Sequence, residues 1–319
     1  MLQKSDMHTI LQNVALLDKT DVCGIVVTFN PDDSFEKNLS ALRCQTGGIV
    51  IVDNGSQPEC LHRLKTVAES YGVEIIFNCA NLGIAAALNI GIQAADQRGF
   101  RWVLTMDQDS FPLEIMVEVL IRAYSHCPFQ EKVAVVGSSS YLHGAGIKER
   151  SIIATIACVE TPYVITSGTL LPVQIYRAVG PFKDEFFMDY VDIEWCLRAR
   201  VAGYRVIKAT EPGMVHSVGS PRRHKVMWRT VFPTHHPAWR RYYITRNRLT
   251  VWKQYWRREP AYVLYDALAF AKEVVKILLY EMDKLRKLGA IGRGLCDATL
   301  GHTGINKRFL SKVTGGNRK

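Results

Sequence analysis

The chain has 319 residues, of which 48% are hydrophobic, 22% charged and 10% aromatic. This is an ordinary globular composition without a repeat or a low-complexity tract, so it excludes a disordered chain, a fibrous protein and a small disulfide-stapled domain. The charge is uneven, because residues 1–220 carry 18 Lys and Arg against 24 Asp and Glu, whereas residues 221–319 carry 22 against 6. A basic last third favours an anionic partner, for which nucleic acid, an anionic membrane surface and an anionic substrate are the candidates.

The eight cysteines are scattered through apolar segments, and none of them forms a Cys-x-x-Cys pair. We therefore expect neither a zinc site nor a disulfide framework, and we expect a reducing, cytoplasmic environment. The best candidate for a membrane span, residues 262–280, contains four charged side chains. It is not expected to cross a bilayer.

Strands and helices alternate along the first half of the chain. Short runs of β-branched and apolar residues predict strands at residues 22–29, 48–52, 73–77, 102–106 and 133–136. Apolar residues at helical spacing predict helices between them, at residues 34–44, 61–71, 84–97 and 113–124. Because strands that alternate with helices of about a dozen residues form parallel sheets covered on both faces, we expect an α/β nucleotide-binding fold.

The pattern changes after residue 138. Residues 159–172 are expected to be extended and residues 192–201 to form a short helix. In the basic last third, apolar residues follow steps of three and four and predict one long helix, with a stripe made of Leu264, Leu268, Ala271, Val275, Leu278, Met282 and Leu285. Lysines and arginines lie near this stripe, so the helix could lie on an anionic membrane or pack on protein.

Polar residues follow three of the predicted strands, and ligands of parallel sheets bind at such strand ends. The turn after the first strand, residues 28–33, contains no glycine, which excludes a dinucleotide-binding glycine motif, and the chain has no P-loop. Without such a loop to neutralise a diphosphate, the acidic residues at the strand ends favour a divalent metal that bridges carboxylate and phosphate.

Asp107-Gln108-Asp109 comes directly after a predicted buried strand. Its two carboxylates could contact the ribose of a nucleotide and a Mg²⁺ or Mn²⁺ ion, although Asp is also common in solvated turns. Asp53 begins an Asp-Asn-Gly-Ser turn, so it is either a turn residue or a contact to the base or ribose.

Asp192 lies at the start of the predicted helix 192–201, and Asp189 precedes it. A carboxylate is favoured in the first turn of a helix, and one held rigidly there beside a cleft can also act as a general base. His216 has two interpretations as well, a third metal ligand or a structural histidine.

Eight segments, in order over residues 21–250, resemble those of inverting family-2 glycosyltransferases with the GT-A fold. The resemblance is strongest to bacterial rhamnosyltransferases that use dTDP-L-rhamnose. The segments are Val26-Val27-Thr28-Phe29-Asn30-Pro31, Val52-Asp53-Asn54, Asn81-Leu82-Gly83-Ile84-Ala85, Asp107-Gln108-Asp109-Ser110, Thr166-Ser167-Gly168, Phe187-Met188-Asp189-Tyr190-Val191-Asp192-Ile193-Glu194, Val215-His216-Ser217-Val218-Gly219 and Arg241-Tyr242-Tyr243-Ile244-Thr245-Arg246-Asn247.

The resemblance implies a role for one or more residues in each segment. The nucleotide-sugar contacts are Thr28, Asn30, Asp53, Asn81, Gly83 and Asp107. The metal ligands are Asp109 and His216, and the base that deprotonates the acceptor hydroxyl is Asp192. The acceptor or diphosphate side comprises Ser167, Gly168, Asp189, Glu194, Arg246 and Asn247. Many family members have Glu-Asp where this chain has Val191-Asp192, so Asp189 and Glu194 remain alternatives for the base.

The resemblance also implies the architecture and the reaction. It implies a GT-A catalytic domain over residues 21–225, with a mostly parallel nucleotide-binding sheet and helices on both faces. An extension over residues 1–20 precedes it, and a basic, mainly helical region over residues 226–319 follows it. The reaction would be inverting, metal-dependent transfer of a sugar, L-rhamnose from dTDP-L-rhamnose, to a hydroxyl of a glycan or lipid-linked acceptor in bacterial cell-surface polysaccharide or glycolipid synthesis.

The basic region leads us to expect a protein on the inner face of the cell membrane, and a homodimer is compatible with the same helix. Two other classes explain part of the sequence. A sugar-nucleotide nucleotidyltransferase would need a glycine-rich, basic loop after the first strand, where this chain is acidic. A nucleic-acid-binding protein would explain the basic third, but the strand-end carboxylates would repel nucleic acid, so no nucleic acid is expected as partner.

Overall fold

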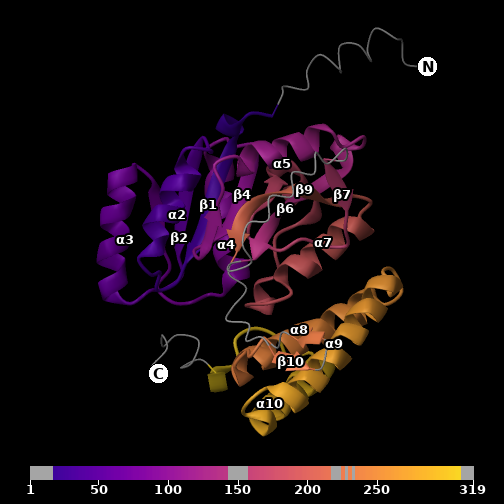
Figure 1. Ribbon diagram of the computed structural model, residues 1–319. Coiled ribbons are helices and arrows are strands. Elements are labelled where there is room, and N and C mark those ends of the chain that lie inside the picture. The colour runs from indigo at the N-terminus through magenta and orange to yellow at the C-terminus, as the bar shows by residue number, and fades with distance from the viewer. Residues whose placement is uncertain (1–16, 143–156, 217–223, 227–228, 232–233, 310–319) are drawn as a thin grey trace, which may run out of the picture.

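The computed structural model describes residues 17–142, 157–216, 224–226, 229–231 and 234–309. Figure 1 shows an α/β body built on one sheet, with the helices of the basic region beside it. The helices of the body are α2 (Ser34–Arg43), α3 (Pro58–Tyr71), α4 (Ile84–Gln97), α5 (Met116–Ser125), α6 (Val173–Val179) and α7 (Val191–Val201). Those of the basic region are α8 (Ala238–Tyr255), α9 (Pro260–Tyr280) and α10 (Lys284–Leu300).

The sheet has nine strands in the order β3-β2-β1-β4-β8-β6-β9-β5, and β7 pairs with β9. The strands are β1 (Val22–Thr28), β2 (Gly48–Asp53), β3 (Glu74–Phe77), β4 (Trp102–Asp107), β5 (Ser110–Pro112), β6 (Val133–Leu142), β7 (Cys158–Glu160), β8 (Thr169–Pro172) and β9 (Arg205–His216). A separate hairpin joins β10 (His224–Val226) to β11 (Arg229–Val231).

The expected α/β fold with a mostly parallel sheet is confirmed. β1, β2, β3, β4, β6 and β9 run in one direction, whereas β5, β7 and β8 run in the other. The sequence predicted extended structure over residues 159–172 but not where it lies in the sheet. In the structure, β8 from this segment lies between β4 and β6. The parallel half of the sheet therefore ends at β4, the strand whose last residue is Asp107 of the Asp-Gln-Asp segment.

Two apolar cores lie on the two faces of the sheet. One contains α4 and α7, and the other contains α2, α3 and α5. All seven residues of β1 are buried, as expected for a central parallel strand. Gly91 lets α4 approach β1 closely, because a Cβ on this residue would lie 2.4 Å from Cγ2 of Ile25. This contact holds the middle of α4 against the middle of β1.

The long helix expected from the apolar stripe is wrong in one respect, because the chain turns between α9 and α10. α9 ends at Tyr280, and Asp283 adopts a left-handed conformation with φ 56° before α10 begins. Glu281 lies in this turn, only 2% exposed, and its carboxylate accepts hydrogen bonds from Arg241 and Lys287. Tertiary ion pairs thus end the helix where the apolar spacing alone would continue it.

The stripe itself is exposed on the basic region. Leu264, Leu268, Val275 and Leu278 on α9 are 45–64% exposed, and Leu285 on α10 is 86% exposed. Their helix packs against the body through its other face, where Tyr262, Asp266 and Ile277 are buried. Among the described residues, no helix is long and apolar enough to span a membrane.

Candidate active site

The carboxyl ends of β1, β2 and β4 bring the predicted nucleotide residues together. Thr28 pairs with Asp53 across β1 and β2, and Val27 pairs with Asp107 across β1 and β4. Because the three strands are parallel and adjacent, these side chains gather at one edge of the sheet. Only this arrangement in space, and not the spacing in the sequence, makes them a common site.

Asp53 holds the turn at the end of β2. Its side chain is fully buried; Oδ1 accepts from the hydroxyls of Thr28 (3.1 Å) and Ser56, and Oδ2 accepts from the amides of Gly55 (3.2 Å) and Ser56 (2.9 Å). The turn interpretation therefore has direct contacts in its favour. A nucleotide contact by Asp53 stays a prediction, and it would have to form beside these four hydrogen bonds.

A network of amides joins the end of β2 to the beginning of α4. Asn54 donates to Oδ1 of Asn81 (3.0 Å), and that same oxygen accepts from the amide of Gly83 (3.0 Å). Gly83 has φ 89°, and a Cβ there would lie 2.4 Å from the carbonyl oxygen of Phe187. Asn81 and Gly83 thus bring the predicted nucleotide edge into contact with the segment that precedes Asp192.

Asn30 and Gln108 define the end of β1. The side-chain oxygen of Asn30 accepts from the amide of Gln57 (2.8 Å), but its buried Nδ2 has no hydrogen-bond partner among the described residues. Gln108, between the two aspartates, binds the backbone of Phe29 at both its N–H (2.7 Å) and its carbonyl (3.2 Å). The sequence analysis missed this role of Gln108. Its two hydrogen bonds hold the Asp-Gln-Asp segment on β1, and the side-chain amide of Asn30 beside it can still donate.

The two aspartates of this segment lie in a shared electrostatic environment. Burial, with a smaller contribution from the Asp109 carboxylate and against the opposing Arg240 guanidinium, raises the pKa of Asp107 to about 6. Asp109 is exposed. Two carboxylates that disfavour each other's charge, one of them open to solvent, fit a divalent cation, which typically binds one or two carboxylates and completes its shell with phosphate and water.

His216, the second predicted metal ligand, and Ser167, predicted on the acceptor or diphosphate side, lie close to the Asp-Gln-Asp segment. The backbone of His216 pairs with Ser110, the residue after Asp109, across β5 and β9, and the His216 side chain lies outside the described part of the chain. Ser167 is buried, accepts from the amide of Asp107 (3.2 Å) and donates to Ser110 (2.8 Å). Within the described ranges, no group of three or more His, Cys, Asp and Glu side chains could hold a metal ion.

Ser167 and Gly168 are both hydrogen-bonded to the backbone of β4. Gly168 has φ 72° and its amide donates to the carbonyl of Thr105 (2.8 Å) on β4. A Cβ on Gly168 would lie 2.7 Å from the sulfur of Met214. These contacts favour a role in positioning Asp107 over the expected contact with acceptor or diphosphate.

The segment before α7 is held in an unusual conformation. Phe187, Asp189 and Tyr190 all have positive φ, between 57° and 65°. Such residues outside glycine store strain and persist only where the surroundings fix them, often at functional sites. Here the side-chain amide of Asn247 donates to the carbonyls of Phe186 (2.9 Å), Met188 (2.8 Å) and Asp189 (3.0 Å).

Arg246 completes this clamp from α8. Its guanidinium donates to the carbonyls of Glu185 and Phe186, both at 3.2 Å, and to that of Gly304. Arg246 and Asn247 are 2% and 1% exposed. Burial and these backbone bonds favour a role in positioning the Phe186–Asp189 backbone, and the expected contact with acceptor or diphosphate stays a prediction.

The three carboxylates near α7 have different surroundings. Glu194 is fully buried and paired with Lys183 (3.1 Å) and Arg198 (3.0 Å), while Asp189 is paired with Arg240 (3.0 Å). Asp192 has no ion pair within the described residues and accepts one hydrogen bond, from the amide of Ile193 (2.8 Å). These ion pairs favour Asp192 over Glu194, and the identity of the base stays a prediction.

Asp192 faces a cavity of about 480 Å³ that lies between α7, α8 and α9. Burial raises the pKa of Asp192 to about 6; the carboxylates of Asp189 and Asp107 add to this, and the hydrogen bond from the amide of Ile193 opposes it. A carboxylate with a raised pKa and no ion pair is suited to accept a proton near neutral pH.

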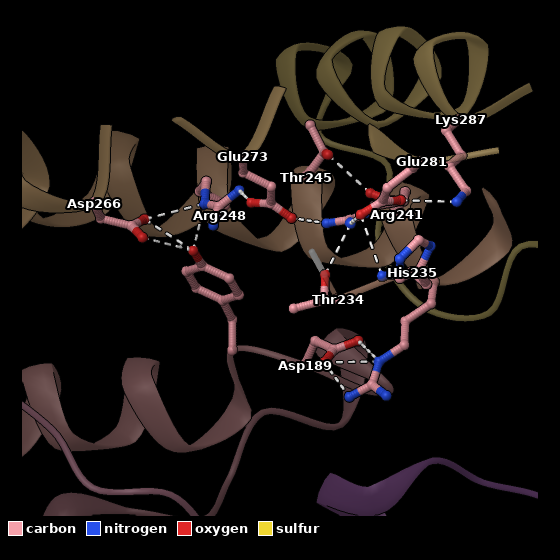
Figure 2. Close-up of polar contacts among 12 residues, drawn as sticks. Asp189, Thr234, His235, Arg241, Thr245, Arg248, Asp266, Glu273, Glu281 and Lys287 are labelled. Carbon is pink, nitrogen blue, oxygen red and sulfur yellow. Dashed lines mark hydrogen bonds and ion pairs between the residues drawn. The ribbon is translucent and has the colours of Figure 1, made fainter. Parts of the chain in front are cut away.

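A buried ionic network, shown in Figure 2, fixes the far wall of this cavity. Arg241 binds Glu273 and Glu281 (2.8 Å), and Arg248 binds Glu273 (2.8 Å) and Asp266 (3.3 Å). The sequence analysis did not find this network, because its paired residues lie 18–40 positions apart. It holds α8, α9 and the α9–α10 turn together beside Asp192.

Known proteins match both the sequence and the fold. The sequence pattern of the family described as Glycosyl transferase family 2 matches residues 23–147. The chain is 32% identical to the dTDP-rhamnosyl transferase RfbF of Shigella flexneri, over 72% of this chain and 78% of that protein.

Solved structures share the fold at low sequence identity. The mannosyltransferase PcManGT from Pyrobaculum calidifontis in complex with GDP-Man and Mn²⁺ aligns over 98% of this chain and 85% of its own, with 15% identity and a TM-score of 0.53. S. aureus TarS 1–349 in complex with UDP-GlcNAc aligns over 87% and 81%, with 13% identity and a TM-score of 0.52. GalNAc-T7 with UDP, GalNAc and Mn²⁺ aligns over 94% and 57%, with 12% identity and a TM-score of 0.57.

The GT-A-like sheet and the carboxylates gathered at its strand ends define a glycosyltransferase. The family match and the rhamnosyltransferase relative agree with this class. The chain belongs to glycosyl transferase family 2.

Proposed function

We propose that this enzyme transfers L-rhamnose from dTDP-L-rhamnose to a hydroxyl of a glycan or lipid-linked acceptor, with inversion at the anomeric carbon. The donor is inferred from the relative named as a dTDP-rhamnosyl transferase. The observation that carries the mechanism is Asp192, which lines the cavity without an ion pair while the two neighbouring carboxylates are paired.

In the proposed reaction, the carboxylate of Asp192 accepts the proton of the acceptor hydroxyl as its oxygen attacks the anomeric carbon. The bond from that carbon to the diphosphate oxygen breaks, and dTDP leaves with the electron pair. A single displacement inverts the configuration and needs only one carboxylate at the reaction centre. General-base help of this kind typically contributes about 10²–10⁴-fold to the rate.

The donor diphosphate would lie at the edge formed by β1, β2 and β4. Asp109, with His216, would hold Mg²⁺ or Mn²⁺ there, and when bound the cation would stabilise the negative charge of the leaving diphosphate. Asp107 and the free amide of Asn30 are proposed to contact the nucleotide. Arg240, which no pattern in the sequence singled out, lies near Asp107 and Asp109 and offers a further positive charge.

The exposed apolar stripe of α9 and α10 supports a peripheral position on an anionic membrane. Lys284 and Arg286 are exposed next to Leu285, and basic residues near an anionic leaflet contribute about 1 kcal/mol each. Lys287, which the sequence also placed on this surface, is instead 6% exposed and paired with Glu281 (2.7 Å). A membrane position agrees with a lipid-linked acceptor.

The donor is tested with a panel of dTDP-L-rhamnose, dTDP-glucose, UDP-GlcNAc and GDP-mannose, measuring binding by calorimetry and release of the nucleoside diphosphate. We expect dTDP-L-rhamnose to bind and turn over at least about tenfold better than the others, a difference of about 1.4 kcal/mol. Equal or better turnover of UDP-GlcNAc or GDP-mannose would refute the donor assignment but not the family.

A further inference from the structure

One wall of the cavity beside Asp192 is formed by α9, and the proposed reaction gives no role to the residues of this wall. α9 contributes Lys272, Glu273 and Lys276 to the lining, opposite Asp189 and Asp192 from the segment before α7 and its first turn. A substrate that reaches Asp192 through this cavity would therefore pass α9. The charges on this wall decide which substrate it can accept.

The cations of the cavity fall into two groups. Arg241 and Arg248 are buried and bonded to Glu273, Glu281 and Asp266. Lys272 and Lys276 have neither an ion pair nor a hydrogen bond within the described residues, although both line the cavity. Glu273, Glu281 and Asp266 are thus already paired with arginines, and within the described residues no ion pair balances the charge of the two lysines.

Their spacing adds to this excess. Lys272 and Lys276 are four residues apart on one helix, so they lie one turn apart on the same face, where like charges destabilise the helix by a few tenths of a kcal/mol. His236 also lines the cavity, and burial lowers its pKa to about 4, with the guanidinium groups of Arg240 and Arg241 adding to the shift. The protein therefore keeps this histidine neutral beside a positively charged wall.

The lysines also border the exposed apolar stripe. At 100° per residue, Lys272 and Lys276 lie about a quarter turn from Leu264, Leu268 and Val275 around the axis of α9. The paired acids Asp266 and Glu273 lie on the far side of the lysines from this stripe, facing the body. Around the axis of α9, the apolar stripe thus comes first, the two lysines come next, and the side that faces the cavity with Asp192 follows.

We infer that Lys272 and Lys276 form a subsite for a phosphate or diphosphate group of the acceptor, placed between the apolar stripe and Asp192. The inference rests on the proposed transfer to a hydroxyl near Asp192 and names the chemistry of that acceptor. The phosphate links either to a lipid, which would lie along the stripe, or to a water-soluble phosphorylated glycan. Two lysines suit this ligand because each offers a point charge and three donors to phosphate oxygens.

The test uses the full-length enzyme with the donor site filled by saturating dTDP and without divalent cation, so that a second anion has to bind elsewhere. Calorimetry measures the affinity of inorganic pyrophosphate for the wild type and for the double variant Lys272→Gln/Lys276→Gln. The matched control is Lys284→Gln/Arg286→Gln, which removes two exposed positive charges from α10. Thermal unfolding verifies that all three proteins are folded.

We expect pyrophosphate to bind the wild type and the control alike and to bind Lys272→Gln/Lys276→Gln about tenfold more weakly, since two charge-assisted contacts are lost. Equal affinity for all three proteins, an equal loss in both variants, or no binding to the wild type would overturn the subsite. If dTDP fails to bind even in a separate titration with Mg²⁺, the proposed donor is wrong, whereas the comparison of the two variants still decides the subsite.

Two further probes separate the sources of the phosphate. Geranyl diphosphate represents a lipid-linked group, and glucose 1-phosphate represents a phosphorylated sugar. Tighter binding of geranyl diphosphate than of pyrophosphate assigns the subsite to a lipid carrier, and tighter binding of glucose 1-phosphate assigns it to a soluble glycan. Either preference has to disappear in Lys272→Gln/Lys276→Gln, and a preference that survives in this variant contradicts the inference.

Discussion

The guanidinium of Arg240 holds the carboxylate of Asp189 at both oxygens, with Nη2 3.0 Å from Oδ1 and Nε 3.2 Å from Oδ2. Figure 2 shows Asp189 apart from the Arg241 and Arg248 network. Because bidentate pairs of this kind fix both partners, Asp189 is committed to Arg240. Asp192, three residues further on, is left as the carboxylate that can accept a proton in the cavity.

Asp192→Asn is therefore expected to lower kcat by about 10²–10⁴-fold, because the side chain keeps its shape and loses the base. The affinity for dTDP should stay near that of the wild type. Asp189→Asn serves as the comparison and should retain far more activity. Loss of kcat in Asp189→Asn with an active Asp192→Asn would move the base to Asp189.

The pH dependence follows from the same group. Burial raises the pKa of Asp192 to about 6, and a base works only when it is deprotonated, so kcat/KM should fall tenfold per pH unit below about pH 6. The raised pKa also means that the folded state disfavours the charged form, so Asp192→Asn should not lower the melting temperature at pH 7.5. The measurement is a pH–rate profile at saturating metal. A flat profile down to pH 4.5 would exclude a base with this pKa.

Removal of divalent metal should stop turnover. EDTA is expected to abolish release of dTDP, and Mg²⁺ or Mn²⁺ should restore it, because the donor diphosphate then regains a cation at Asp109. Asp109→Asn should raise the metal concentration needed for half-maximal activity, whereas Asp32→Asn, an exposed acid in the turn after β1, should not. Full activity of the wild type in EDTA would remove the metal from the reaction.

Asn247 offers a test of positioning from a distance. Asn247→Ala removes the side-chain donor to the carbonyls of Met188 and Asp189 and leaves the carbonyl of Phe186 with Arg246 alone, which should cost about 1–3 kcal/mol in the free energy of unfolding. Because the strained segment then loses its clamp, kcat should fall while the affinity for dTDP changes little. Thr250→Ala, which removes one local bond to the carbonyl of Arg246, is the control. An unchanged kcat would show that the segment keeps its shape without Asn247.

Membrane association is tested by sedimentation with vesicles. Binding should require anionic lipid, weaken as salt rises, and decrease about fivefold or more in Lys284→Gln/Arg286→Gln, which removes two exposed cations beside the stripe. Leu264→Ser/Leu268→Ser should also weaken binding, but to the same extent at low and at high salt, because this variant loses apolar contacts and not charges. Absence of binding to anionic vesicles at low salt would assign the stripe to a protein contact instead.

The sequence by itself determined most strands and helices of residues 22–136 and the family resemblance. Alternating apolar runs such as residues 22–29 and 48–52 predicted the strands, because a buried parallel strand needs continuous apolar residues whatever its partners are. The acids after β4 predicted a strand-end site, and this site agrees with the confirmed family. The roles of single residues in it remain proposals.

Only the tertiary structure decided which of these residues face one another. Asp192 and Glu194 are two positions apart, so a helix sends them in different directions, but their spacing does not say which direction leads to a cavity and which to Lys183 and Arg198. In the same way, α9 ends before Glu281 because this residue is bonded to Arg241, 40 positions away in the sequence. Local periodicity reflects the neighbours within one element, whereas burial, pairing and pKa depend on contacts between elements far apart in the chain, which one sequence does not specify.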